Sequence, residues 1–132
     1  MGSIARILHT RNDARFRSLG MQKGQFVFLT RLCENPGVSV VQLARLTRVD
    51  QTTATKAVQK LQAAGYLTRQ PSTDRRSQSL WPAEQARQAY ELIVKAENAD
   101  LVEGFRGFTD TESQMMLSLL ERIRTNLEGE NS

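Results

Sequence analysis

A short helix, a tight turn and a longer helix form the pattern that most constrains the fold of this chain. Residues 39–42, Ser-Val-Val-Gln, fit the capping box that begins a helix, and we expect that helix to end near Thr47-Arg48. Asp50 is a good N-cap for a second helix over 51–64, which Gly65 stops. This succession predicts a helix-turn-helix motif.

After Gly65 the pattern changes to that of a β-hairpin. Residues 66–69 and 77–81 are strand-like, and residues 71–74 between them carry turn-forming side chains. We interpret this hairpin as the wing of a winged helix. Three charged residues stand at or just past its tip: Asp74, Arg75 and Arg76.

Helical periodicity flanks the motif on both sides. It predicts a first helix over 4–19, a buried helix over 26–33 and a long helix that Pro82 opens at its first turn. Residues 109–112, Thr-Asp-Thr-Glu, form a second capping box before the last helix. That helix carries a narrow apolar seam typical of pairing with another helix: Met116, Leu119, Leu120, Ile123 and Leu127. The fold class is therefore mainly α with a small two-stranded β wing.

The composition leaves little room for catalysis. One histidine and one cysteine cannot supply the three or four ligands of a usual zinc site, and no glycine-rich phosphate loop or serine nucleophile elbow occurs. Cys33 cannot form an internal disulfide. The longest strongly apolar run, 26–29, is far shorter than the ~20 residues of a membrane helix. We expect a cytoplasmic protein without enzyme activity, metal, cofactor or membrane partner.

The net charge of +4 is unevenly divided along the chain. Residues 1–76 hold thirteen basic and four acidic residues, whereas residues 77–132 hold five basic and ten acidic residues. The positive charge therefore lies in the half that contains the helix-turn-helix motif and the wing. This division indicates an anionic partner for that half.

The outward face of the second helix of the motif offers hydrogen-bonding groups and ammonium groups but no carboxylate. A helical wheel places Ala54, Ala57, Val58 and Leu61 toward the core. Opposite them and on the flanks lie Gln51, Thr52, Thr55, Lys56, Gln59 and Lys60. Amides and hydroxyls can read base edges in the major groove, and lysines pair with phosphates. An ordinary solvated face usually mixes acidic and basic residues, so we favour a DNA contact.

The wing adds three guanidinium groups beside this helix, those of Arg69, Arg75 and Arg76. Arginine suits a narrow minor groove, and Asp74 can hold one of these arginines in an extended geometry. The alternative is a solvated turn rich in Asp and Arg. The preceding helix-turn-helix motif favours the DNA contact.

These features together resemble the multiple-antibiotic-resistance regulator (MarR) family of winged-helix transcription factors. The resemblance covers nearly the whole chain and is carried by residues 19–21 with 25–26, 36–44, 49–58, 61–67 and 69–76, which ends in Asp-Arg-Arg. The order and spacing of these segments make the resemblance specific. The chain departs from the family at Trp81 and Glu84, where a capping threonine and a glycine are usual.

The resemblance implies one unit over 1–132, with a winged helix-turn-helix over 22–82 and helical dimerisation parts over 1–20 and 83–128. It also implies a homodimer whose terminal helices intertwine, with this interface: Ile4, Leu8, Met116, Leu119, Leu120, Ile123 and Leu127. The recognition helix would begin with Gln51, Thr52, Thr53, Thr55 and Lys56. Arg76 would enter the minor groove with Asp74 as its orienting partner, and Ser39 would cap a helix that faces a phosphate.

Members of this family often respond to a small aromatic or phenolic effector. The candidates for such a site here are His9, Arg15, Phe16, Phe26, Phe28 and Trp81. The alternative, which we favour for any one of them, is that the phenylalanines are core residues and His9 is a surface or interface residue. Oxidant sensing through Cys33 is also conceivable, but its place beside Leu29 and Leu32 favours a structural thiol.

The function that follows is a sequence-specific regulator of transcription that binds double-stranded DNA. We expect a ligand-responsive repressor that acts as a homodimer on a pseudo-palindromic operator, with half-sites roughly 34 Å apart. The alternative is a winged-helix module that binds a protein instead of DNA. The basic wing and the carboxylate-poor helix face speak against that alternative.

Overall fold

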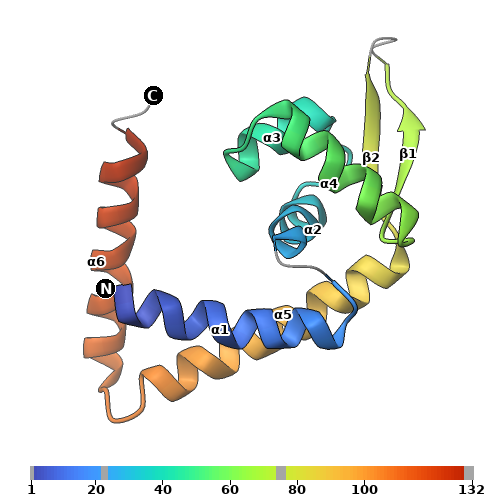
Figure 1. Ribbon diagram of the computed structural model, residues 1–132. Helices are drawn as coiled ribbons and strands as arrows, with labels where there is room; N and C mark the ends of the chain where they lie inside the picture. The colour runs from blue at the N-terminus through green and yellow to red at the C-terminus, as the bar shows by residue number, and fades with distance from the viewer. Residues whose placement is uncertain (1, 22–23, 74–76, 130–132) are drawn as a thin grey trace. The chain divides into compact units, whose positions relative to one another are not determined.

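A computed structural model describes residues 2–21, 24–73 and 77–129, and within them six helices and two strands (Figure 1). In chain order these are α1 (Gly2–Ser18), α2 (Gln25–Glu34), α3 (Val40–Thr47), α4 (Gln51–Ala63), β1 (Leu67–Pro71), β2 (Gln78–Pro82), α5 (Glu84–Gly104) and α6 (Asp110–Gly129). The chain divides into two compact units, Met1–Ala96 and Glu97–Ser132. The predicted fold class, mainly helical with a two-stranded wing, is confirmed. The wing-tip residues Asp74, Arg75 and Arg76 lie outside the described residues.

Side-chain caps begin the two helices of the motif as predicted. The Ser39 hydroxyl accepts from the Gln42 backbone N–H at 3.2 Å, and the Gln42 side chain accepts from the Ser39 N–H at 2.9 Å. The Asp50 carboxylate accepts from the backbone N–H of Thr53 at 2.7 Å. Each cap satisfies N–H groups that the first turn of a helix cannot bond internally, so both starts are determined locally.

The turn between these helices reverses the chain at a residue with left-handed backbone geometry. Arg48 has φ 59° and ψ 41°, and its N–H donates to the carbonyl of Arg45 at 3.2 Å. The N–H of Val49 then donates to the carbonyl of Ala44 at 3.1 Å. This pair of bonds ends α3 and directs the chain into α4.

The core of the first unit is built from the inner faces of α2, α3 and α4. The four residues that the helical wheel turns inward on α4 are all buried: Ala54, Ala57, Val58 and Leu61. They pack in one cluster with Leu29, Leu32 and Leu43. Tyr66, which follows α4 in the chain, belongs to the same buried cluster. Its hydroxyl donates to the carbonyl of Leu19 at 2.9 Å.

The wing is an antiparallel pair in which Arg69 lies opposite Leu80 and Leu67 lies opposite Pro82. Two expectations are wrong here. Pro71 is the last residue of β1 and not part of the turn, and Pro82 ends β2 instead of opening α5, which begins at Glu84. A proline is tolerated at such strand ends because it need not donate there. Pro82 is buried, and Ala83 extends the ladder by donating to the carbonyl of Tyr66 at 3.0 Å.

The connection between α2 and α3 pairs with the wing, which the sequence analysis did not predict. The N–H of Gly37 donates to the carbonyl of Leu80, and the N–H of Leu80 donates to the carbonyl of Val38, both at 2.8 Å. Beside this pairing the Trp81 ring lies on Gly37, and its indole N–H donates to the Ser79 hydroxyl at 2.9 Å. The wing is thereby held next to the start of α3.

The second unit contains the end of α5 and all of α6. The predicted capping box begins α6, since Thr109 and Glu112 exchange hydrogen bonds of 2.9 and 3.1 Å. The rings of Phe105 and Phe108 meet edge to face at 5.1 Å in the connection. No residue of α6 is buried. Within the described ranges, no helix has the length and apolar character needed to span a membrane.

We predict that Gly37 tolerates a side chain much less well than Gly20. Both have left-handed backbone geometry, with φ of 91° and 77°. A Cβ at Gly20 meets nothing within 4 Å, whereas at Gly37 it would lie 3.1 Å from Cζ2 of Trp81. Gly20→Ala should lower the free energy of unfolding by about 1 kcal/mol through backbone strain alone, and Gly37→Ala by roughly 2–3 kcal/mol.

Urea unfolding at one protein concentration measures both losses. Equal losses in the two variants would contradict a close contact between Gly37 and Trp81.

Candidate nucleic-acid interface

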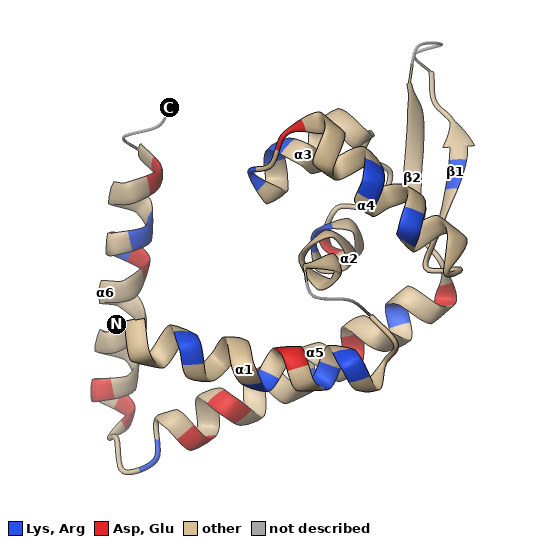
Figure 2. Ribbon diagram, viewed as in Figure 1, with Lys and Arg blue, Asp and Glu red and all other residues tan. Residues whose placement is uncertain are grey.

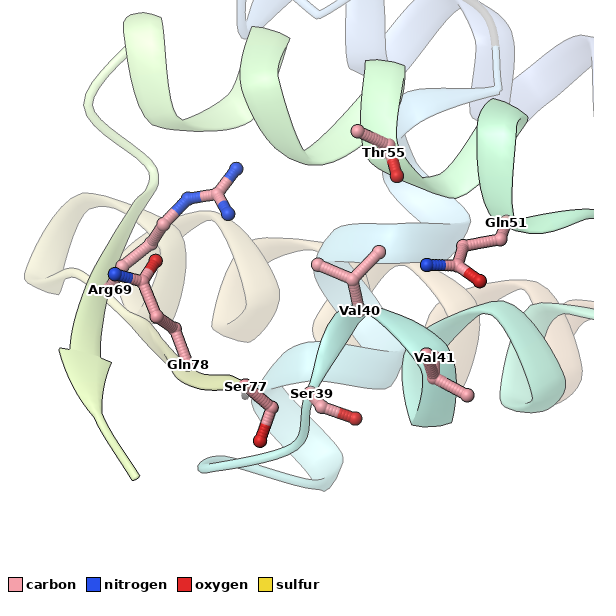
Figure 3. Close-up of a pocket in the computed structure, with 8 residues that line it drawn as sticks. All are labelled: Ser39, Val40, Val41, Gln51, Thr55, Arg69, Ser77 and Gln78. Carbon is pink, nitrogen blue, oxygen red and sulfur yellow. The ribbon is translucent and has the colours of Figure 1, made fainter. Parts of the chain in front are cut away.

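A groove of about 480 Å³ lies between the start of α3, the start of α4 and the two strands of the wing (Figure 3). The residues that line it are Ser39, Val40, Val41, Gln51, Thr55, Arg69, Ser77 and Gln78. They come from four elements or their edges, and the pairing of Leu80 with residues 37–38 brings those elements together. The groove is thus a product of the tertiary fold.

Four of the DNA-contact residues that the sequence predicts line this groove: Ser39, Gln51, Thr55 and Arg69. Thr52, Lys56 and Gln59 are exposed on α4 outside the groove lining. Thr53 is also exposed, and its backbone N–H is bonded to Asp50. Asp74, Arg75 and Arg76 lie outside the described residues. The contacts of all these residues with DNA stay predictions.

Sequence reasoning missed the other four lining residues. Ser77 and Gln78 stand at the start of the returning strand, and their place beside Ser39 depends on how β2 pairs with residues 37–38. Val40 and Val41 occupy the first turn of α3, where Val41 stays 41% exposed. An exposed valine in the first turn after an N-cap is the signal that could have drawn attention to this surface.

The charged residues of the segment that supplies most of the groove lining are almost all basic. Between residues 35 and 73 the chain has five basic residues, Arg45, Arg48, Lys56, Lys60 and Arg69, and one acidic residue, Asp50. Figure 2 shows basic residues on α3, α4 and β1, whereas α5 and α6 carry most of the acidic ones. The excess of cations makes this face attractive to a polyanion.

Asp50, the one carboxylate in this stretch, serves the helix start. The hydrogen bond from the Thr53 backbone N–H lowers the pKa of Asp50, followed by the bond from the Thr53 side chain and the nearby charge of Lys56. Its negative charge caps the N-terminus of α4, where the helix dipole favours a carboxylate. The exposed face of α4 beyond the cap keeps its cationic and hydrogen-bonding character.

The effector candidates are divided between the core and the surface. Phe16 is buried, and its ring stacks on that of Phe26 with centroids 4.1 Å apart. Arg15 donates to Asn12 at 2.9 Å, and His9 is exposed. Phe28 is also buried in the core, and Trp81 lies on Gly37 at the wing. These contacts favour the core role for the three phenylalanines, and an effector site stays a prediction.

Cys33 lies half-buried on α2, with its sulfur 3.7 Å from the carbonyl of Ala86. Burial raises the pKa of the Cys33 thiol to about 11; the charge of Arg87 lowers it in part, and Glu34 raises it further. A thiol with so high a pKa holds little reactive thiolate near neutral pH. In the described part of the chain, no group of three or more His, Cys, Asp or Glu side chains could hold a metal ion.

A helix-turn-helix followed by a wing that borders its second helix defines a winged-helix protein. The model of the MarR family matches residues 19–77. The uncharacterized HTH-type transcriptional regulator YybA of Bacillus subtilis (strain 168) is 33% identical over 129 residues, covering 97% of this chain and 86% of that protein.

Solved structures agree with this match. A MarR protein from Peptoclostridium difficile is 42% identical with a TM-score of 0.85, covering 98% of this chain and 85% of that one. A MarR family transcriptional regulator from Listeria monocytogenes, solved in complex with a 26mer DNA, is 30% identical with a TM-score of 0.85, covering 98% and 87%. This chain belongs to the MarR family of transcriptional regulators.

We predict that Cys33 is a slow nucleophile. With a thiol pKa of about 11, it should react with iodoacetamide at pH 8 about a hundred times more slowly than an unhindered cysteine. The rate should rise about tenfold per pH unit between roughly pH 7 and 9 without levelling off. Mass spectrometry of timed samples measures the alkylation, with Cys33→Ser as the blank. A plateau below pH 9 would show an ordinary or activated thiol.

Proposed function

We propose that this chain is a sequence-specific repressor of transcription that binds double-stranded DNA through α4 and the wing. The observation that carries the proposal is the groove beside α4, which hydroxyl, amide and guanidinium groups line together with two valines; among the described residues of this lining there is no carboxylate. Groups of this kind bond to base edges and phosphates. A protein bound across an operator represses transcription because it blocks the access of RNA polymerase to the duplex.

Each part of the interface has a distinct task in this proposal. Gln51 and Thr55 face the groove from the first turns of α4, where they can reach base edges (Figure 3). Lys56 is exposed on the same helix and pairs with a phosphate. At the start of α3, the N–H groups beyond the Ser39 cap favour a second phosphate. Arg69 extends the contact from the wing.

The comparison with known proteins supports the DNA contact. The Listeria monocytogenes relative was solved with a 26mer DNA, and it shares both the fold and 30% of the sequence with this chain. A partner protein is the rival to DNA for the same winged helix. The excess of basic residues around the groove favours the duplex over an ordinary protein surface.

We infer a homodimer from the apolar side chains that are exposed to solvent in the single chain. The seven residues of the predicted interface are all exposed: Ile4, Leu8, Met116, Leu119, Leu120, Ile123 and Leu127, by 39–63%. A 20-residue helix with an apolar seam and no buried residue needs a partner surface. A second copy of the chain supplies that surface, and its two-fold symmetry matches a pseudo-palindromic operator.

The proposal also includes release by a small aromatic or phenolic effector and action in the cytoplasm. The predicted contacts of the effector are His9, Arg15, Phe16, Phe26 and Trp81, and the two stacked phenylalanine rings would have to leave their core positions to reach it. An effector that binds the DNA-free conformation better would lower the population that can hold the operator.

We predict that Lys56→Ala weakens DNA binding without unfolding the protein. The variant removes two phosphate contacts per dimer, so the slope of log K against log salt should become shallower by about two. Affinity at physiological salt should fall about tenfold. Lys95→Ala, an exposed lysine on α5 outside the groove, is the matched control and should bind like the wild type.

The measurement is fluorescence anisotropy with a duplex selected from a random pool, at several salt concentrations. Binding by the wild type that is absent or insensitive to salt would exclude the DNA function. An unchanged affinity and slope in Lys56→Ala would remove this residue from the interface.

We predict that truncating the α6 seam breaks the dimer. Leu119→Ala combined with Ile123→Ala removes four side chains per dimer and should raise the dissociation constant by roughly a hundredfold or more. Gln114→Ala combined with Thr125→Ala changes two exposed polar residues of the same helix and should leave the dimer intact. Analytical ultracentrifugation and circular dichroism report mass and folding. A seam variant that remains a folded dimer at low micromolar concentration would contradict this interface.

A further inference from the structure

A hydrogen bond joins the end of α4 to the wing at the edge of the groove. The Nε–H of Arg69, on β1, donates to Oε1 of Gln62, on the last turn of α4, at 2.8 Å. Arg69 itself lines the groove, and Figure 3 shows its side chain reaching from β1 into the space between the strands and α4. Gln62 therefore contacts a groove residue without lining the groove.

The backbone between the two residues is held firmly, so the points from which the two side chains extend are fixed relative to each other. Gly65 has φ 85°, and its N–H donates to the carbonyl of Gln62 at 3.1 Å. The N–H of Tyr66 donates to the carbonyl of Leu61 at 2.8 Å, and both Tyr66 and Leu67 are buried. These contacts set the angle at which β1 leaves α4.

The bond leaves most of the N–H groups of Arg69 available to a ligand. Within residues 2–21, 24–73 and 77–129 no carboxylate pairs with Arg69, and its Nε–H is the one donor held by a side chain. The four N–H groups of the two terminal nitrogens are not used by this bond. A neutral amide thus holds the guanidinium in place without cancelling its charge.

We propose that Gln62 is a positioning residue for DNA binding: it orients the Arg69 guanidinium toward the duplex while leaving its charge uncompensated. This inference rests on the proposed DNA function. Holding the arginine before binding reduces the rotamer entropy that would otherwise be lost on the duplex. A carboxylate at position 62 would orient Arg69 equally well but would neutralise it.

The first experiment tests whether the effect of Gln62 passes through Arg69. Gln62→Met keeps the length of the stem and removes the acceptor. Binding is measured for the wild type, Gln62→Met, Arg69→Ala and the double variant on a fluorescein-labelled duplex of mixed sequence of about 30 base pairs. Gln88→Met, at an exposed glutamine of α5, is the matched control.

We expect Gln62→Met to bind about tenfold more weakly, because each dimer carries two such bonds, and to have no further effect in the Arg69→Ala background. Equal losses in both backgrounds, or no loss in either, would overturn the proposal. If Arg69→Ala binds like the wild type while the wild type shows a steep salt dependence, the proposal fails and DNA binding stands. If the wild type does not bind DNA, both fall.

The second experiment separates orientation from charge. Proton exchange at the Arg69 Nε–H, followed by NMR on the DNA-free protein, should be slow in the wild type and in Gln62→Glu, and fast in Gln62→Met. Gln62→Glu should nevertheless bind DNA more weakly than the wild type, with a salt slope shallower by about two per dimer. A bond that served only to fasten the wing would leave the DNA affinity of Gln62→Glu unchanged, and that result would overturn the proposal.

Discussion

The pairing of Leu80 with residues 37–38 is the interaction on which the rest of the groove depends. Two backbone hydrogen bonds of 2.8 Å join β2 to the connection that leads into α3, and Leu80 is fully buried there. The pairing adds a third segment to the two-stranded hairpin, and a two-stranded hairpin alone is marginally stable in water at best. With the pairing, the wing and the starts of α3 and α4 become three walls of one groove.

The chemistry of that groove follows from the scarcity of acidic residues between positions 35 and 73. Asp50 is the one acidic residue between positions 35 and 73, and its carboxylate is bonded to the N-terminus of α4. In the part of the chain that the structure describes, Arg69 is held by the amide of Gln62 and not by an acid. A neutral amide therefore orients Arg69, and the one carboxylate caps a helix. The cations keep their attraction for a phosphate backbone. The acidic residues gather in the helices beyond the wing (Figure 2).

Several elements were predictable because their signals are local. The capping boxes at Ser39 and Thr109 begin helices through hydrogen bonds between residues three apart. The sequence alone therefore predicts these two helix starts. The inward face of α4 follows from helical periodicity in the same way. The ends of the strands were not predictable from local signals, since Pro82 is equally compatible with the first residue of a helix and with the last residue of a strand. Its burial opposite Leu67 decides between them.

The sequence by itself determined the helix-turn-helix, the order of the elements and the excess of positive charge in the first half of the chain. Each of these depends on neighbours along the chain or on composition. The tertiary structure alone decided that Ser77 and Gln78 join Ser39 at the groove, that the Trp81 ring lies on Gly37, and that Gln62 holds Arg69. These contacts depend on strand pairing and on the angle between α4 and β1, which arise only when distant segments pack together.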